Sequence, residues 1–330
     1  MAERTLRFLS ARDVAQALPM REAIEAMKEA FRRLSAGGAV MPVRTHIAAA
    51  SAPGDALFMP SYLPAEGKIG VKVVTVYPGN RALGLPVIQA IVAVLDAATG
   101  SPLAVMDGAM LTAIRTGAAS GAATDLLARP DAATAAIFGS GPQARTQLEA
   151  VCAVRSIRRA RVYDPDASRV AAFAREMAGR LGIVIQAAES PAQALEGADV
   201  VCTATTSQVP VFADSDIAPG THLNAIGSYK PGVREIPGET VRRARVVVDH
   251  LPSALAEAGD LLIPLREGLF GQDHIHAELG QIVAGARTGR ESPEQITLFK
   301  SVGVAVQDLA AAALALANAE RLGLGARLSL

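Results

Sequence analysis

The chain has 330 residues, of which 50% are hydrophobic and 19% charged, and 32 Lys and Arg balance 32 Asp and Glu. This length suggests two domains, and the neutral balance without a long basic run argues against nucleic-acid or anionic-membrane partners. Charges interrupt every apolar run before membrane-spanning length, and two cysteines in so long a chain are typical of a reducing, cytoplasmic setting.

The first third of the chain predicts a mixture of helices and strands. Ser10 and Asp13 form a capping-box pattern before a short helix, and residues 20–38 place apolar side chains at helical spacing before a glycine. Apolar runs separated by Gly, Pro, Asn and Asp then predict strands of a largely antiparallel or mixed sheet, over 40–49, 55–63, 68–80 and 86–108. A helix rich in small residues is expected over 109–128.

The rest of the chain alternates strand and helix patterns. Six short apolar runs, several linked by helical segments, predict a parallel doubly wound sheet, with strands over 133–139, 159–164, 183–188, 198–205, 221–227 and 244–250. A long, strongly apolar final helix is expected over 298–323. It would return to the first domain or pack in a subunit interface.

A glycine-rich motif follows the first of these strands. It has the form G-x-G-x-x-A and consists of Gly139, Ser140, Gly141, Pro142, Gln143 and Ala144. Glycines at such a turn let backbone N–H groups approach a pyrophosphate at the helix N-terminus. Asp164, at the end of the next strand, is placed to accept hydrogen bonds from the adenosine ribose hydroxyls. A carboxylate there would repel a ribose phosphate, which favours NAD, with NADP as the alternative. The other reading is a glycine-rich turn beside a surface aspartate.

The reactive end of such a cofactor should lie where neighbouring parallel strands end. The first, fourth and fifth strands end at Gly139, near Thr205, and at Gly227 and Ser228. We therefore expect these ends to adjoin and to border the crevice. Tyr229 follows directly in the segment "NAIGSYKPGVRE", so it is expected at the crevice edge.

Three cations stand among apolar or small residues, namely Arg44, Lys72 and Arg115. Such residues are seldom buried without a partner, and a cluster of them would bind a carboxylate. A partly desolvated lysine can also donate a proton. The alternative is that each faces solvent, because spacing does not show that they converge. His274 and His276 have no third ligand at a metal-site spacing, so no metal site is predicted.

Together these features resemble the ornithine cyclodeaminase/mu-crystallin family over nearly the whole chain. The resemblance rests on "PVRT" (42–45), "GVKVV" (70–74), "LTAIRTGAASGAAT" (111–124), "FGSGPQA" (138–144), "NAIGSYKPGVRE" (224–235), "AELGQIVAG" (277–285) and "LFKSVGVAVQDL" (298–309). It implies a homodimer and an α/β fold in which a Rossmann-type doubly wound parallel sheet is inserted in an α+β substrate-binding and dimerisation domain. The expected limits are 1–118 with 303–330 for that domain, and 119–302 for the NAD(P)-binding domain.

The resemblance also implies roles for individual residues. Arg44, Lys72 and Arg115 match positions that hold the substrate carboxylate. Thr116 matches a position near the cofactor. The family's positions that contact the cofactor correspond here to Gly141, Gln143, Asp164 and Thr205. Members of the family use a nicotinamide cofactor on amino or imino acids.

Two departures bear on the reaction. Tyr229 stands where cyclodeaminases and alanine dehydrogenases of the family keep a catalytic aspartate, and a phenol stays protonated at neutral pH. Leu57 stands where cyclodeaminases carry a glutamate for the distal ammonium group. The resemblance therefore implies a reductase of a small cyclic ketimine, either Δ1-pyrroline-2-carboxylate or Δ1-piperideine-2-carboxylate, in which Tyr229 donates a hydrogen bond or walls the pocket. The alternatives are a cyclodeaminase, an amino-acid dehydrogenase, or a low-turnover binding protein like some mu-crystallins.

Overall fold

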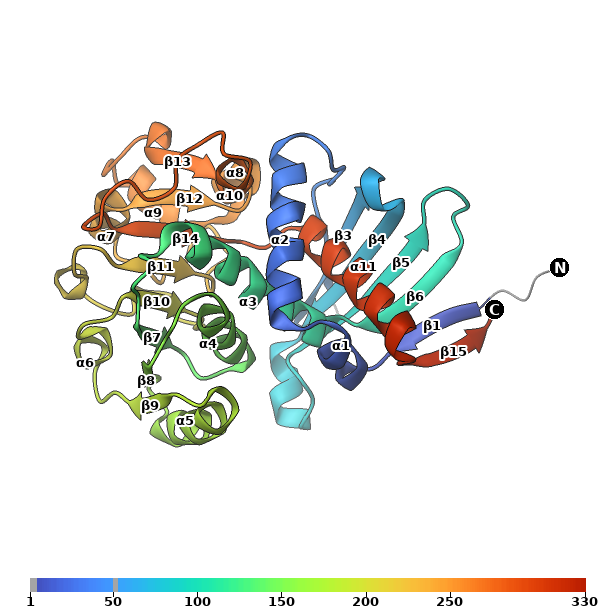
Figure 1. The fold of residues 1–330 in the computed structure, drawn as a ribbon, viewed down its shortest axis with the longest axis horizontal. Helices are drawn as coiled ribbons and strands as arrows, with labels where there is room; N and C mark the ends of the chain where they lie inside the picture. Colours follow the sequence, from blue (N-terminus) through green and yellow to red (C-terminus); the bar gives the residue numbers. More distant parts are fainter. Residues whose placement is uncertain (1–4, 50–52) are drawn as a thin grey trace. The chain divides into compact units, whose positions relative to one another are not determined.

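The computed structural model describes residues 5–49 and 53–330. The chain divides into two compact units: unit 1 is Met1–Arg115 with Val304–Leu330, and unit 2 is Thr116–Gly303 (Figure 1). Each unit contains one sheet with its own helices. No helix within the described residues is both long and apolar enough to cross a lipid bilayer.

Unit 1 is built on a seven-stranded mixed sheet, as the alternating apolar runs predicted. The strand order is β15-β1-β6-β5-β4-β3-β2, and the β1–β6 pair alone among these pairs is parallel. Short 3-10 turns at Pro64–Glu66 and Pro78–Leu83 join neighbouring strands. The strands are β1 (Thr5–Leu9), β2 (Thr45–Ala49), β3 (Gly54–Leu63), β4 (Lys68–Val76), β5 (Ile88–Asp96), β6 (Pro102–Asp107) and β15 (Ala326–Ser329).

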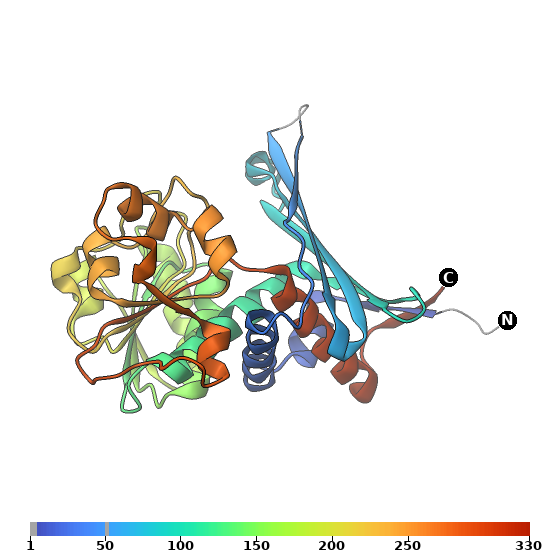
Figure 2. The same ribbon diagram turned by 90° about the horizontal axis from the view of Figure 1, so that it is seen from above.

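Three helices pack on one face of this sheet, and Figure 2 shows α2 and α11 on that side. They are α1 (Ala11–Ala17), α2 (Met20–Ser35) and α11 (Ala305–Leu322). The predicted capping box begins α1: Ser10 Oγ accepts a hydrogen bond from Asp13 N at 3.3 Å, and Asp13 accepts one from Ser10 N at 2.9 Å. Within the described residues no α-helix covers the opposite face.

Helix α3 (Gly108–Leu127) leads into the eight-stranded sheet of unit 2. Every strand pair in that sheet is parallel, and the order is β13-β12-β14-β11-β10-β7-β8-β9. The order runs in opposite directions on either side of β7, which places a topological switch point between β7 and β10. The strands are β7 (Thr134–Phe138), β8 (Arg159–Tyr163), β9 (Val184–Ala187), β10 (Val200–Thr203), β11 (His222–Ala225), β12 (Arg245–Val248), β13 (Ile275–Glu278) and β14 (Thr297–Lys300).

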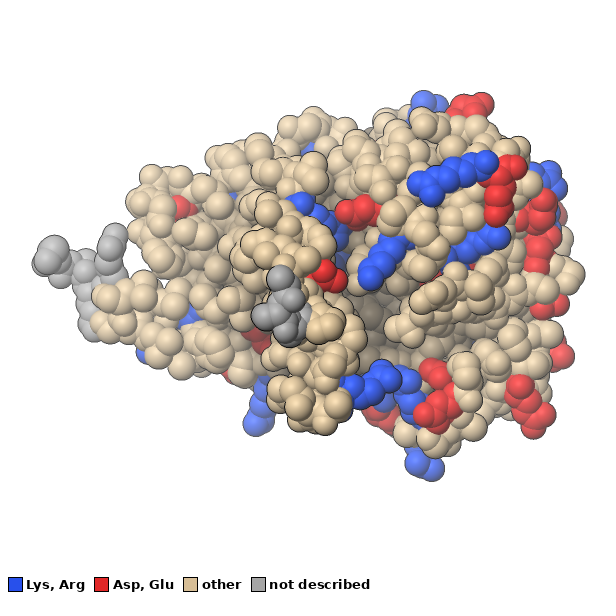
Figure 3. Space-filling model, turned by 180° about the vertical axis from the view of Figure 1, so that it is seen from behind, with Lys and Arg blue, Asp and Glu red and all other residues tan. Residues whose placement is uncertain are grey.

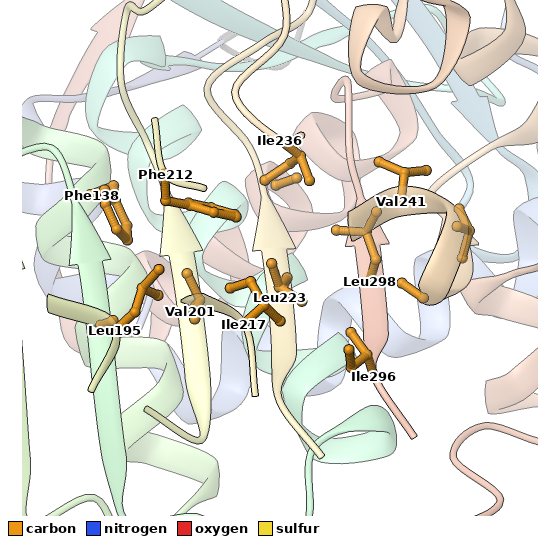
Figure 4. Close-up of a cluster of buried hydrophobic side chains, with 14 of the residues drawn as sticks. Phe138, Leu195, Val201, Phe212, Ile217, Leu223, Ile236, Val241, Ile296 and Leu298 are labelled. Carbon is orange, nitrogen blue, oxygen red and sulfur yellow. The ribbon is translucent and has the colours of Figure 1, made fainter. Parts of the chain in front are cut away.

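Side-chain alternation along these strands builds two cores, one on each face of the sheet. Ala136 and Phe138 of β7 point into one core, drawn in Figure 4, whereas Ala135 and Ile137 point into the other. Helices flank the sheet, as expected of a doubly wound fold. They are α4 (Pro142–Val154), α5 (Ala167–Leu181), α6 (Pro191–Leu195), α7 (Gly238–Arg243), α8 (Leu251–Glu257), α9 (Gly259–Arg266) and α10 (Leu279–Val283).

The final helix begins later than predicted. Residues 298–300 belong to strand β14, which lies between β11 and β12, and helix α11 begins at Ala305 after Gly303 with a φ of +80°. Leu298 and Phe299 are fully buried, on opposite faces of the sheet. A short apolar run buried on both sides has no period that separates strand from helix, which is why the prediction of a single helix over 298–323 was wrong at its start.

Candidate active site

Two of the predicted cations in unit 1 meet on one carboxylate. Lys72, in β4, places Nζ 2.8 Å from Asp308 Oδ2, and Arg115, in α3, places Nε 2.9 Å from Asp308 Oδ1. The three side chains are 5% exposed or less. Since a carboxylate and two cations are buried together, the cluster keeps a net positive charge and is suited to an anionic ligand.

The packing of α11 against β4 brings Asp308 to this place. Gly70 lies two residues before Lys72 and so on the same face of β4, where a Cβ would stand 2.7 Å from Leu309 Cδ1. A side chain at this position would require Leu309 of the helix to shift. Gln307 completes the arrangement, because its Oε1 accepts hydrogen bonds from Arg115 Nη1 at 2.9 Å and from Val304 N at 2.8 Å. The first turn of α11 is thereby tied to Arg115.

Electrostatics also links Arg44 to this cluster. The pKa of Lys72 is lowered from 10.5 to about 8. Burial is the largest cause of this shift, the Asp308 carboxylate opposes it, and the positive charges of Arg115 and Arg44 add to it. Arg44 precedes β2 and is half-buried. The structure thus brings the three cations predicted from the sequence into one electrostatic neighbourhood. A lysine with such a pKa exchanges its proton near neutral pH, as an acid catalyst must.

Sequence reasoning missed Asp308 and Gln307. Both lie in the apolar run "AVQDLAAAALAL", which the sequence predicts as a packing helix. A single acid among so many apolar residues was the available signal, because a buried carboxylate needs a cationic partner. What the run does not reveal is which cation that partner is.

In unit 2, the glycine-rich motif forms a tight turn between β7 and the N-terminus of α4. Gly139 has a φ of +97°, and a Cβ on it would lie 2.5 Å from Ala204 O. Gly141 is the N-cap of α4 and has no side-chain cap, and Pro142 takes the first helical position. Apart from its chain neighbours, the only atom of the described residues within 4 Å of a Cβ on Gly141 would be Arg169 Nη2, at 3.9 Å. The N–H groups of the first helical turn are therefore open to a phosphate.

The side chains around the motif also fit a dinucleotide. Asp164 Oδ2 accepts a hydrogen bond from Ser140 Oγ at 2.7 Å, and its Oδ1 accepts one from Asp166 N at 3.0 Å, so its carboxylate lies beside the loop. Gln143 Oε1 is buried without a hydrogen-bond partner among the described residues, as expected of an atom that a ligand satisfies. Ala144 is fully buried under the loop.

The predicted strand ends adjoin at the carboxyl edge of the sheet. Ala204 N donates to Phe138 O at 2.9 Å, and Gly227 N donates to Thr203 O at 3.2 Å, so the segments after β7, β10 and β11 are neighbours. Thr205, Gly227 and Ser228 all lie on this edge. Tyr229 follows them with 37% of its surface exposed.

Three further residues named in the sequence analysis are placed by the structure. Thr116 is buried in α3, and its carbonyl accepts a hydrogen bond from Gln147 Nε2 at 3.3 Å. His274 Nε2 donates to Val241 O at 2.8 Å, and His276 Nε2 lies 2.9 Å from Thr288 O. Across residues 5–49 and 53–330, no group of three or more His, Cys, Asp and Glu side chains is arranged to hold a metal ion.

Comparison with known proteins shows which family the chain resembles over nearly its whole length. The sequence profile of the ornithine cyclodeaminase/mu-crystallin family matches residues 4–321. A Δ1-pyrroline-2-carboxylate reductase of Bacillus cereus is 41% identical over 321 residues, which cover 97% of this chain and 98% of that protein. The Thermococcus litoralis Δ1-pyrroline-2-carboxylate reductase, solved with NADH and L-proline, has a TM-score of 0.93 and 46% identity, covering 97% of this chain and 99% of that one. An archaeal alanine dehydrogenase dimer with bound NAD has a TM-score of 0.91 and 35% identity, covering 99% of each chain.

Proposed function

Because this chain belongs to the ornithine cyclodeaminase/mu-crystallin family, we propose that it is an NAD(P)H-dependent reductase of a small cyclic ketimine. The substrate class is Δ1-pyrroline-2-carboxylate or its six-membered homologue Δ1-piperideine-2-carboxylate, and the product is the cyclic amino acid. The observation that carries the proposal is the buried cluster of Lys72, Arg115 and Asp308. It occurs in a chain 46% identical to a reductase solved with NADH and L-proline.

The residues of unit 1 supply what such a substrate needs. Arg115 and Arg44 provide guanidinium groups for the carboxylate, which they can bind in a two-point geometry. Lys72 adds a third positive charge, and its pKa of about 8 lets it hold or release a proton near neutral pH. Reduction of a C=N bond places a hydride on carbon and a proton on nitrogen, and Lys72 Nζ is our candidate for the proton. Correct placement of reacting groups alone can contribute up to about 7–11 kcal/mol.

The residues of unit 2 fit the hydride donor. The N-terminus of α4 and the open backbone at Gly141 suit a pyrophosphate, and Asp164 suits a ribose diol. A nicotinamide cofactor supplies the hydride when it is bound. Asp164 supports NAD as the preferred cofactor, and NADP is the second candidate.

Two positions argue against a cyclodeaminase. Leu57, in β3, has no group that could bind the distal ammonium of a diamine. Asp55 lies two residues away, but its Oδ1 is 2.6 Å from His46 Nε2, so that carboxylate already has a partner. Tyr229 supplies no carboxylate base at the strand-end loop. The remaining chemistry suits a compact substrate whose C=N bond already exists.

The test is a substrate panel. Purified protein is mixed with NADH or NADPH and either cyclic imine, and cofactor oxidation is followed by absorbance at 340 nm. We expect oxidation with at least one ring size, and Lys72→Ala is expected to lower kcat by at least about 100-fold, the lower range for loss of a positioned acid. Failure to oxidise either cofactor with both imines would contradict the proposal.

A dehydrogenase acting on an open-chain amino acid is the second candidate, because an archaeal alanine dehydrogenase shares this fold at a TM-score of 0.91. NAD-dependent deamination of L-alanine faster than imine reduction would favour it. Release of ammonia and proline from ornithine would instead indicate a cyclodeaminase. Tight binding of a small carboxylate with no turnover of any of these substrates would indicate a binding protein.

The exposed face of the unit 1 sheet supports the proposed homodimer. The face opposite the helices carries partly exposed large apolar side chains, namely Phe8, Ile47, Ile69 and Ile91. Figure 3 shows few Lys, Arg, Asp or Glu atoms on this side of unit 1. An apolar sheet face of this kind is typical of an interface. We propose that a second copy of the chain covers it.

A further inference from the structure

A single buried carboxylate joins the ends of two neighbouring strands in unit 2. Glu235 is fully buried and accepts four hydrogen bonds. Two come from Thr205, whose N and Oγ1 each lie 2.7 Å from Glu235 Oε1. The others come to Oε2 from Gly227 N at 2.7 Å and Thr203 Oγ1 at 2.9 Å. The donors belong to the segments at the ends of β10 and β11, so Glu235 ties these two ends together.

A buried ion pair between Asp260 and Lys300 holds the backbone of Glu235 in place. Asp260 Oδ1 accepts hydrogen bonds from Glu235 N at 2.6 Å and Ile236 N at 3.0 Å, and its Oδ2 lies 2.7 Å from Lys300 Nζ. Lys300, at the end of β14, also donates to Ser228 O. Asp260 and Lys300 are both fully buried. The network therefore extends over three neighbouring strand ends, those of β10, β11 and β14.

Close backbone packing makes this edge sensitive to small shifts. A Cβ on Gly227 would lie 2.5 Å from Thr205 O and 2.5 Å from Glu235 Oε1. A Cβ on Gly139 would lie 2.5 Å from Ala204 O. The segment 203–205 is thus confined between two glycines whose backbones it contacts. A displacement or substitution of the Glu235 carboxylate would therefore shift the backbone at Thr205 and Gly227.

We propose that Glu235 is a positioning residue that fixes the cofactor-binding edge of unit 2 in its binding conformation before the cofactor arrives. The inference rests on the proposed function, because the edge is where a nicotinamide cofactor is expected in such a sheet. Burying two carboxylates and a lysine stabilises a fold no better than apolar packing would. What the network provides is a set of directed hydrogen bonds, which reduce the ordering cost of binding.

The test measures affinity for the cofactor by calorimetry, with no substrate present. In Glu235→Gln the amide nitrogen cannot accept from Gly227 N–H, so one directed bond and the negative charge are lost. We expect the Kd for NADH to rise about tenfold or more, as for loss of a charged hydrogen-bond acceptor. Hydrogen exchange should accelerate in segments 203–207 and 226–234. In kinetics, KM for the cofactor should rise while kcat at saturation changes by less than about threefold.

The matched control lies at the amino ends of the strands of the same sheet, whereas Glu235 lies at their carboxyl ends. Asp199 accepts hydrogen bonds from Ala133 N at 2.8 Å and Thr134 N at 2.9 Å, where β7 begins. Asp199→Asn makes the same chemical change at the amino ends of the strands. We expect it to lower the melting temperature and to leave the Kd for NADH unchanged.

If Glu235→Gln does not fold, Thr203→Val removes one of the four bonds with little change in volume, and a two- to fivefold rise in Kd is expected, about the value of one hydrogen bond. The inference is wrong if Glu235→Gln, or Thr203→Val in its place, binds NADH within twofold of the unsubstituted protein. It is also wrong if Asp199→Asn weakens binding equally. An unsubstituted protein that binds NADH but reduces neither imine would contradict the proposed function and leave this inference standing.

Discussion

Lys72 Nζ and Asp308 Oδ2 lie 2.8 Å apart with side-chain exposures of 3% and 2%. The pair has two opposing effects on Lys72. Loss of hydration disfavours its charged form and lowers its pKa, while the carboxylate favours the charged form and raises it. Desolvation is the larger effect, so the pKa of Lys72 falls to about 8.

The first prediction concerns the pH dependence of the reaction. The Lys72 ammonium is present below its folded pKa of about 8 and is lost as the pH rises through that value. If it holds the carboxylate and donates the proton, kcat/KM for the imine should fall about tenfold per pH unit above pH 8. Lys72→Arg, which stays charged, should lose this descending limb. If the descending limb keeps its position in Lys72→Arg, the group that titrates is the substrate imine and not Lys72.

A second prediction concerns stability at alkaline pH. The unfolded chain keeps the Lys72 proton up to about pH 10.5, whereas the folded chain releases it near pH 8. The unfolded state therefore binds more protons between these values, so Lys72 makes the free energy of unfolding rise with pH across that window. Denaturant unfolding of Lys72→Met at pH 8 and pH 10 should show a smaller rise than the unsubstituted protein. An equal rise in both proteins would contradict the lowered pKa.

Asp308→Asn is expected to be costly, because it leaves two buried cations without their carboxylate. We expect a loss of about 3–5 kcal/mol in the free energy of unfolding. Because Asp308 raises the pKa of Lys72, its removal should also move the descending limb of the pH profile to lower pH. The control is Glu25→Gln, which changes an exposed carboxylate 2.7 Å from Lys28. That variant should leave both stability and the profile nearly unchanged.

Cofactor preference is expected to depend on Asp164. Asp164→Ser removes the negative charge that would repel a ribose phosphate, so the ratio of Kd for NADPH to Kd for NADH should fall by about tenfold or more. Asp166 is a nearby acid that caps α5 by accepting from Ser168 N at 3.0 Å. Asp166→Asn should cost about 0.5–1 kcal/mol of stability at most and leave that ratio unchanged. Equal shifts in both variants would argue against a specific role for Asp164.

Gly139 and Gly179 offer a matched pair of glycine substitutions. Gly139→Ala places a Cβ against Ala204 O at a positive φ, so we expect a loss of about 1–3 kcal/mol in stability and weaker NADH binding. Gly179 lies inside α5, and beyond the helix's own backbone a Cβ there meets no atom of the described residues within 4 Å. Gly179→Ala should instead stabilise the protein by about 0.5–1 kcal/mol. Thermal unfolding and calorimetry measure both effects.

The proposed dimer is tested by placing a charge on the exposed sheet face. Ile91 is 51% exposed on the side opposite the helices, and Ile91→Arg should convert a dimer into monomers in sedimentation velocity. Val184, 59% exposed on the edge strand β9 of unit 2, is the control. Val184→Arg should remain dimeric. Dimers in both variants would place the interface on another surface.

Much of the fold could be predicted because its signals are local. The Ser10–Asp13 capping box, the glycine turn at Gly139 and the strand–helix alternation of unit 2 each depend on residues a few positions apart. Strand β14 shows the limit of such signals, since Leu298 and Phe299 are buried on both faces and have no period of their own. These residues form a strand because they pair with β11 on one side and with β12 on the other.

The sequence by itself determined the kinds of groups present: a dinucleotide turn, an acid at the end of the next strand, and three cations suited to a carboxylate. Only the tertiary structure decided their partners. Arg115 meets Asp308 across 193 positions, and Glu235 receives donors from three residues at two strand ends. Backbone periodicity is a property of neighbouring residues, so a sequence displays it directly. The pairing of buried charges depends on which surfaces pack together, and that is decided by the balance of burial and desolvation over the whole fold.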